Sequence, residues 1–328
     1  MKHILIFSIF YLITLNPAIS HDEEIYTSEG QWTLSSGDEN FVKSEDQNIL
    51  SHKSPEDELA GRYLYDQEDV TDDYQLHAIY ILASDSRDAK YDVNGTIENI
   101  VLKANKHLKK NTDQKQFRLD LTKAGKLDVS FIRVDKTRRE INKLENGAGY
   151  FTGIAIANGF YSPKKLYTIF YQDKYKREWG QVGDALFDTP NGEIEVNSGV
   201  VYLGAESKND AWVPHTHELL HALGFVQLCA PGAVNERDSR WGKNDHLNYT
   251  NDMMSDRGGD KEYIDKGRKD YYDHSNLDCE MDFKNSAFLE PTEIDFQLQP
   301  FSPSCKLTRW QPKYKHDHSL SCLSRLIF

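Results

Sequence analysis

Five consecutive residues, His217-Glu218-Leu219-Leu220-His221, carry the clearest chemistry in this chain. Histidines four positions apart project from the same side of an α-helix, so both imidazoles can hold one zinc ion. Glu218 stands beside the first histidine, where its carboxylate can take a proton from a metal-bound water. The spacing therefore predicts a hydrolytic zinc site, with His217 and His221 as ligands and Glu218 as the general base.

The flanking residues favour a helix that positions this pair. Pro214 is well placed near a helix start, where its missing N–H costs nothing, and Gly224 is expected where a helix ends in a left-handed turn. His215 lies two positions before His217 and faces a different side of such a helix, so we predict a neighbouring or outer role for it. The helix also has apolar residues to bury: Leu219, Leu220, Ala222 and Leu223.

Catalytic zinc normally has three protein ligands and one open position for water, and the helix supplies only two. In the metzincin clan the motif extends to a third histidine three residues after the glycine, followed by a methionine turn beneath the metal. Gln227 occupies that position here, and an amide is a poor zinc ligand. Either the site is incomplete or the third ligand comes from elsewhere in the chain.

A longer set of residues resembles a group of exported bacterial metzincin-like proteins. In that group Val-Gln follows the glycine, Ala-Pro comes shortly after, and a histidine stands six residues before Asp-x-Met. The matching residues here are Gly224-Phe225-Val226-Gln227, Ala230-Pro231, His246, Asp252 and Met254. The likeness continues through Leu277-Asp278-Cys279 and Asn285-Ser286-Ala287-Phe288-Leu289 and, more loosely, over the half that begins at residue 76.

The resemblance implies that His246 is the third zinc ligand and that Met254 belongs to the methionine turn. Asp252 is the second candidate ligand and otherwise an outer carboxylate. The chain departs from the group at Leu247 and Ser255, where the group usually has cysteines. It also lacks a tyrosine just past the turn methionine, for which four residues are open substitutes: Tyr249, Tyr263, Tyr271 and Tyr272.

The elements that must position the zinc helix begin near residue 76. Residues 76–82 form an apolar run typical of a buried strand, and apolar residues spaced three and four apart over 97–108 predict a helix packed on a sheet. Further strands are expected at 117–121, 127–134, 166–171 and 200–203, and a long loop at four glycines: Gly147, Gly149, Gly153 and Gly159. The expected fold is α+β and metzincin-like. It has a twisted mixed sheet with a backing helix and the zinc-binding helix, and an irregular C-terminal subdomain across a substrate cleft.

The amino terminus predicts export. A basic start, an apolar run over 4–15 and small residues before His21 are typical of a secretory signal peptide over 1–20, too short for a membrane span. Residues 21–75 hold 16 acidic and three basic residues, a net charge of −13 that equals that of the whole chain. This segment is expected to be a disordered linker or a pro-segment. No basic stripe exists for nucleic-acid phosphates, so nucleic-acid binding is not expected.

The remaining chain divides into a catalytic N-terminal subdomain at 76–224, a C-terminal subdomain at 225–300 and a basic tail at 301–328. Four cysteines in an exported chain favour two disulfides. Cys305–Cys322 would close a short tail loop and leave Cys229–Cys279, but the pairing stays open among three possibilities. Asp256 and Asp260 make calcium a second candidate ion, although a solvated loop is the preferred interpretation.

Together these features predict a secreted zinc endopeptidase, extracellular or periplasmic, that cleaves peptide or protein substrates. The alternative is a degenerate metzincin-fold binding or adhesion protein without catalysis, which Gln227 and the missing tyrosine motivate. The intact His-Glu-x-x-His set argues against it, because a binder needs no general base. Substrate preference and oligomeric state cannot be derived from these residues.

Overall fold

The computed structural model describes residues 59–189, 192–205, 209–234, 245–256 and 261–291. It also gives the backbone of two short strands, Glu24–Thr27 (β1) and Gly30–Thr33 (β2). The expected signal peptide, most of the acidic segment, Asp260 and the tail with Cys305 and Cys322 lie outside the described residues. None of the helices in the described ranges is long and apolar enough to cross a membrane.

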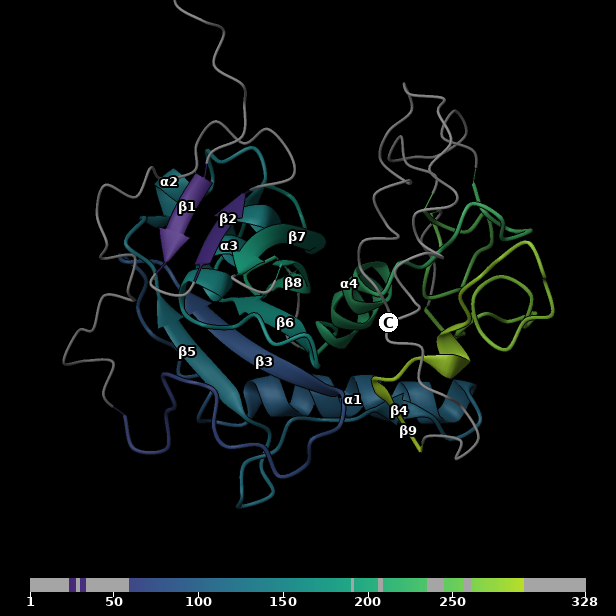
Figure 1. Cartoon of the computed structure of the whole chain (residues 1–328), viewed down its shortest axis with the longest axis horizontal. Coiled ribbons are helices and arrows are strands. Elements are labelled where there is room, and N and C mark those ends of the chain that lie inside the picture. Colours follow the sequence, from purple (N-terminus) through teal and green to yellow (C-terminus); the bar gives the residue numbers. More distant parts are fainter. Residues whose placement is uncertain are drawn as a thin grey trace, which may run out of the picture.

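A seven-stranded mixed sheet forms one half of the molecule (Figure 1). Four strands are parallel to one another: Gln75–Leu82 (β3), Val129–Arg133 (β5), Lys165–Tyr171 (β6) and Gly192–Tyr202 (β8). Gly180–Thr189 (β7) runs antiparallel to β8, and β2 and β1 follow it, which gives the order β1-β2-β7-β8-β6-β3-β5. β3 and β6 are buried along their whole length, as expected for strands covered on both faces.

Helices cover both faces of this sheet. Thr96–Asn111 (α1) and Trp212–Ala222 (α4) contact each other on one face (Figure 1). Leu76, Tyr80 and Leu219 belong to the core cluster on that face. Gly147–Ala157 (α3) contacts β7 and β8 on the other face. Residues of α3 form a second core cluster there, and the short helix Arg138–Ile141 (α2) adds Ile141 to it. The predicted α+β class with a twisted mixed sheet is thus confirmed.

The glycine-rich stretch that was expected to be a long loop is the helix α3, so that expectation was wrong. Its glycines allow close packing: a Cβ on Gly147 would lie 2.7 Å from the ring of Tyr175. The Asn146 side chain caps the helix by accepting from the Gly149 N–H at 2.9 Å. Because α3 is buried on every side, its sequence shows no amphipathic period that would have revealed a helix.

The end of the acidic segment, residues 59–75, packs on the sheet rather than forming the flexible linker expected. The Arg62 guanidinium lies 3.8 Å from the ring centre of Phe131 and donates to Asp88 and Asp92 at 2.8 and 2.6 Å. Tyr63 forms a bridge to β5. Acidic residues of the segment also meet a cation of the sheet, since Lys165 Nζ lies 2.6 Å from Asp66 Oδ1 and 2.7 Å from Asp69 Oδ1, and the composition alone did not show these contacts.

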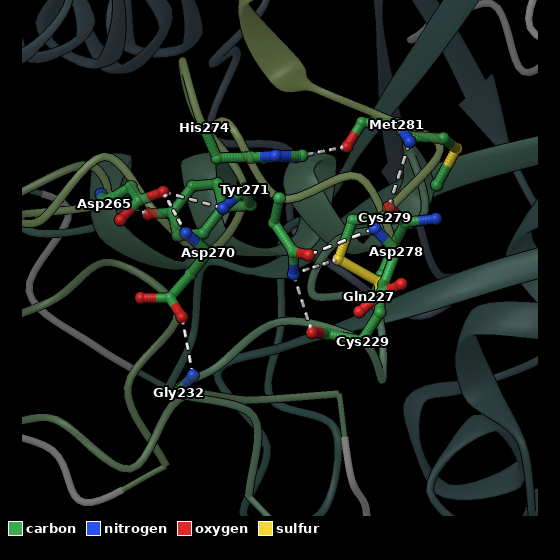
Figure 2. The surroundings of a disulfide bond; sticks show 11 residues. Gln227, Cys229, Gly232, Asp265, Asp270, Tyr271, His274, Asp278, Cys279 and Met281 are labelled. Carbon is green, nitrogen blue, oxygen red and sulfur yellow. Dashed lines mark hydrogen bonds between the residues drawn. A yellow bond between two sulfur atoms is a disulfide. The ribbon is translucent and has the colours of Figure 1, made fainter.

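The described residues beyond Gly224 have little regular structure, as predicted. They include a 3₁₀ turn at Phe283–Asn285 (η2) and the strand Leu289–Glu290 (β9), which pairs with Gln116–Phe117 (β4). The Cys229–Cys279 disulfide is present, with a Cα–Cα distance of 5.4 Å (Figure 2). One Asp265 carboxylate oxygen accepts three successive backbone N–H groups, of residues 270–272, at 2.7 to 2.9 Å. Side-chain bonds of this kind and the disulfide replace regular hydrogen-bond ladders here.

Candidate metal centre

Three histidine nitrogens converge at the junction of the two halves. Nε2 of His217 lies 3.1 Å from Nε2 of both His221 and His246, and the latter two are 3.3 Å apart. His217 and His221 come from one face of α4, and His246 comes from the irregular half. Zinc–nitrogen bonds of about 2.0–2.1 Å at tetrahedral angles place two ligand nitrogens about 3.4 Å apart. The three nitrogens are therefore spaced for a single ion.

The other ring nitrogen of each histidine bonds to an oxygen acceptor. Nδ1 of His217 lies 2.7 Å from Met253 O, Nδ1 of His221 lies 2.8 Å from Phe225 O, and Nδ1 of His246 lies 2.7 Å from Asp245 Oδ1. Carbonyl and carboxylate oxygens only accept, so each Nδ1 carries the proton. Each neutral ring then turns an unprotonated Nε2 toward the other two.

This donor set fits a cation. Three nitrogen lone pairs facing one another at about 3 Å repel, and a positive charge between them removes that repulsion. Burial, together with the neighbouring His246 and the Lys261 ammonium, lowers the pKa of His217 to about 3. His217 is therefore in its neutral, metal-binding form across the physiological pH range.

Glu218 lies in the same turn of α4, 7% exposed, with its side chain against β7. A Cβ placed on Gly180 would meet Glu218 Cγ at 2.6 Å and Oε1 at 2.9 Å. The carboxylate of the predicted general base is thus held between the zinc helix and the edge of the sheet.

The predicted methionine turn lies beneath His217. Met253 and Met254 are fully buried, and the Met253 carbonyl is the acceptor for His217. Asp252 Oδ1 accepts from the Met254 N–H and from the Tyr271 hydroxyl, both at 2.9 Å. Asp252 therefore supports the turn, and it is not among the groups that converge with the three histidines. Burial raises the pKa of Asp252 to about 6.

Other residues singled out in the sequence have structural roles. His215 packs against the sheet, where its Nδ1 is 3.0 Å from Thr168 Oγ1 and burial lowers its pKa to about 3.

Gln227, at the position of the usual third ligand, accepts from the Met281 N–H at 3.1 Å beside the disulfide (Figure 2). Of the four candidate tyrosines, Tyr271 donates to Asp252, and the Tyr272 hydroxyl accepts from the Asp113 N–H at 2.9 Å.

Sequence reasoning missed Asp245. Its carboxylate orients His246 and also lies 4.0 Å from His221 Nδ1. An acidic residue directly before a proposed histidine ligand was the available signal. The carbonyls of Phe225 and Met253 carry no such signal, because every residue has a carbonyl group.

A second group of ionisable side chains lies at the amino-terminal end of β3, where Asp66, His77, Asp120 and Asp128 come close together. Lys165 supplies a cation of its own there, with Nζ 2.7 Å from Asp120 and in contact with Asp66. His77 Nδ1 lies 2.7 Å from Asp120, and its Nε2 lies 3.1 Å from the Ser130 hydroxyl. We assign this group to stabilisation of the fold, because the lysine ammonium occupies the place that a metal ion would need.

This chain has only limited similarity to known proteins. No family model and no curated protein matches this sequence. Among solved structures, wild-type OgpA from Akkermansia muciniphila is 16% identical with a TM-score of 0.32, and the match covers 49% of this chain and 51% of that one. Catalytically inactive OgpA in complex with an O-glycopeptide (glycodrosocin) substrate is 14% identical with the same TM-score, over 50% and 52%. The match thus spans about half the length of those chains.

Proposed function

We propose that this protein is a zinc-dependent endopeptidase of the metzincin type. In this proposal His217, His221 and His246 hold the metal, and Glu218 is the general base. One observation carries it: three Nε2 atoms converge within 3.3 Å, and each imidazole is oriented through Nδ1. The buried Glu218 follows His217 on the same helix. Three imidazoles leave one coordination position open, as in catalytic rather than structural zinc sites.

The bound zinc ion would supply a water of lowered pKa and would polarise the scissile carbonyl. Glu218 would take up a proton on its carboxylate when water is activated and would donate it to the leaving amine nitrogen. Asp245 and the carbonyls of Phe225 and Met253 hold the imidazoles in the required tautomer throughout. The hydrogen bond to the Met253 carbonyl holds the ring orientation of His217.

The edge of the sheet supports a peptide as substrate. β2 pairs with residues 186–188 of β7, and no strand in the described parts of the chain pairs with the outer edge at 180–185. An extended peptide could add to this edge through main-chain hydrogen bonds. The edge begins at Gly180, against which Glu218 lies, so a peptide bound there would pass the candidate metal centre.

The proposal extends to organisation and location. The 76–224 subdomain contributes His217 and His221, and the 225–300 subdomain contributes His246. We propose that residues 1–20 direct export and that the mature protein acts outside the cytoplasm. The Cys229–Cys279 disulfide supports an oxidising location, because such bonds are rare in reducing compartments.

Zinc analysis combined with cleavage of casein or a peptide library tests the function. Purified wild-type protein should bind one zinc ion and cleave peptides. Glu218→Gln should keep the metal and lose activity by about 10²–10⁴-fold, the usual contribution of a general base. The exposed Glu262→Gln change is a matched control and should leave activity unaltered. Undiminished hydrolysis by Glu218→Gln would refute the assigned role.

The same measurements separate the peptidase from a binding protein that keeps the fold. Zinc binding by the wild type without cleavage of any peptide in the library would favour the binding protein. Absence of zinc binding would exclude both the metal centre and the peptidase.

A further inference from the structure

We infer that Gly180 of β7 is a positioning residue for Glu218, because its missing side chain fixes the orientation of the catalytic carboxylate. The inference rests on the proposed role of Glu218 as the base. It concerns a residue of a different element, β7, 38 positions earlier in the chain.

Space, and not backbone conformation, explains the glycine at position 180. Gly180 lies in a regular strand and is not among the glycines with positive φ, so its φ and ψ do not exclude other residues. A Cβ there would be 2.6 Å from Glu218 Cγ and 2.9 Å from Glu218 Oε1, distances that real Cβ atoms do not show. The Glu218 side chain thus crosses β7 where the strand carries no side chain.

Gly199 of β8 plays a different part under the same residue. It pairs with Val182, two residues along β7 from Gly180, so both glycines present the same face of the sheet to α4. A Cβ on Gly199 would lie 3.0 Å from the backbone C of Glu218 and the backbone N of Leu219. Gly199 makes room for the helix backbone, and Gly180 makes room for the glutamate side chain.

This difference predicts different consequences for a methyl group at each position. At Gly180 the methyl meets the Glu218 side chain, which can rotate about its own bonds, and the Val200 carbonyl at 2.9 Å, which requires a small shift of β7. The backbone of α4, which carries the metal ligands, is not among the nearest atoms. At Gly199 it meets helix backbone, which cannot rotate away, so α4 must shift and carry His217 and His221 with it. Only the first change should separate the base from the metal site.

Gly180→Ala tests the inference. We expect zinc affinity close to wild type, a lower unfolding temperature because of the Val200 carbonyl, an unchanged KM and a kcat about 100-fold lower, as for a reacting group displaced by about 1 Å. In the cobalt-substituted protein, the pH dependence of the visible absorption should shift toward that of Glu218→Gln, because the carboxylate no longer meets the metal-bound water. Adding Gly180→Ala to Glu218→Gln should lower kcat no further, since residues that act as one unit are not additive.

Gly183→Ala is the matched control on the same strand. Its Cβ would meet Thr152 Oγ1 at 2.2 Å and the Ala148 carbonyl at 2.6 Å, on the face of the sheet away from Glu218. It should lower stability, while kcat per folded molecule and the cobalt spectrum stay as in the wild type, measured below its unfolding temperature.

Three outcomes would overturn the inference: wild-type kcat and cobalt spectrum in Gly180→Ala, an equal further loss of kcat in the Glu218→Gln background, or failure of Gly180→Ala to fold. In the last case the Val200 carbonyl, which a Cβ would meet at 2.9 Å, would oppose the methyl rather than Glu218. If the wild type binds metal but cleaves nothing, the proposed function fails, whereas the cobalt titration still tests Gly180.

Discussion

Asp245 is the one charged group among the three acceptors that orient the candidate zinc ligands. Its bond to His246 Nδ1 fixes the tautomer and increases the basicity of Nε2, and groups in this position usually contribute 10- to 100-fold to metal affinity. We therefore expect Asp245→Ala to weaken zinc binding by about that factor, measured by competition with a chelator. The exposed Asp278→Ala should leave affinity unchanged. Equal affinities for the two variants would show that Asp245 does not support the metal.

The buried Asp252 predicts a dependence of stability on pH. Its pKa of about 6 in the folded protein exceeds the ordinary 3.8, so the folded state binds this proton more tightly than the unfolded state. The corresponding stability is fully present below about pH 4 and is lost as the pH rises through 6. Asp252→Asn removes the titration but keeps an oxygen that can accept from Met254 and Tyr271.

Urea unfolding of wild type and Asp252→Asn at pH 4.5 and 7.5 measures this effect. The free energy of unfolding of the variant relative to wild type should increase by about 2 kcal/mol between the two pH values, because pH 4.5 already lies above the ordinary pKa of 3.8. A difference between the two proteins that does not change with pH would contradict the assignment.

Single residues of the candidate site could be predicted from the sequence only where they lie close together along the chain. His217, Glu218 and His221 lie within one turn of helix, so their spacing alone indicated the chemistry. His246 is 25 residues beyond His221, and only a family resemblance pointed to it. Other features could not be predicted, because they depend on contacts between residues far apart in the sequence. These are the acceptor carbonyls of Phe225 and Met253 and the missing side chain at Gly180.

The elements show the same dependence on periodicity. β3, β6 and α1 were predicted near their observed bounds because their apolar residues form long runs or recur at helical spacing. β7 was not predicted, since Gly180, Gly183 and Asp184 interrupt any apolar alternation. The strand is nevertheless fixed by ten paired residues of β8, a constraint from outside its own sequence.

One polar side chain joins α1 to β4 and gives a prediction at the scale of elements. Asn105, 3% exposed, donates to the Phe117 carbonyl at 2.9 Å and accepts from the Phe117 N–H at 3.0 Å. Asn105→Ala leaves both buried backbone groups without these partners, so we expect a loss of about 2–4 kcal/mol in the free energy of unfolding. Urea denaturation measures it, with the exposed Asn99→Ala on the same helix as control. Equal stability of the two variants would mean that water replaces the side chain.

For the whole molecule, the Cys229–Cys279 disulfide should matter most, because the described residues of the half that it crosslinks have little regular structure. The two cysteines are 50 positions apart, and closing a loop of that length corresponds to about 4 kcal/mol of stability in the chain-entropy model. Replacing both cysteines with serine should lower the free energy of unfolding by about this amount. A phosphine reductant should destabilise the wild type similarly and leave the double variant unaffected. A wild type that resists reduction without loss of stability would contradict this expectation.

The position of His246 inside the crosslinked loop also bears on how the protein matures. His217 and His221 lie on α4 and come together as soon as that helix forms. His246 lies in the loop that the disulfide closes, so its position depends on that loop. Oxidation should therefore precede firm capture of the metal during biosynthesis. A newly made chain that is still reduced would then stay latent, and the cell that makes it would be spared its activity.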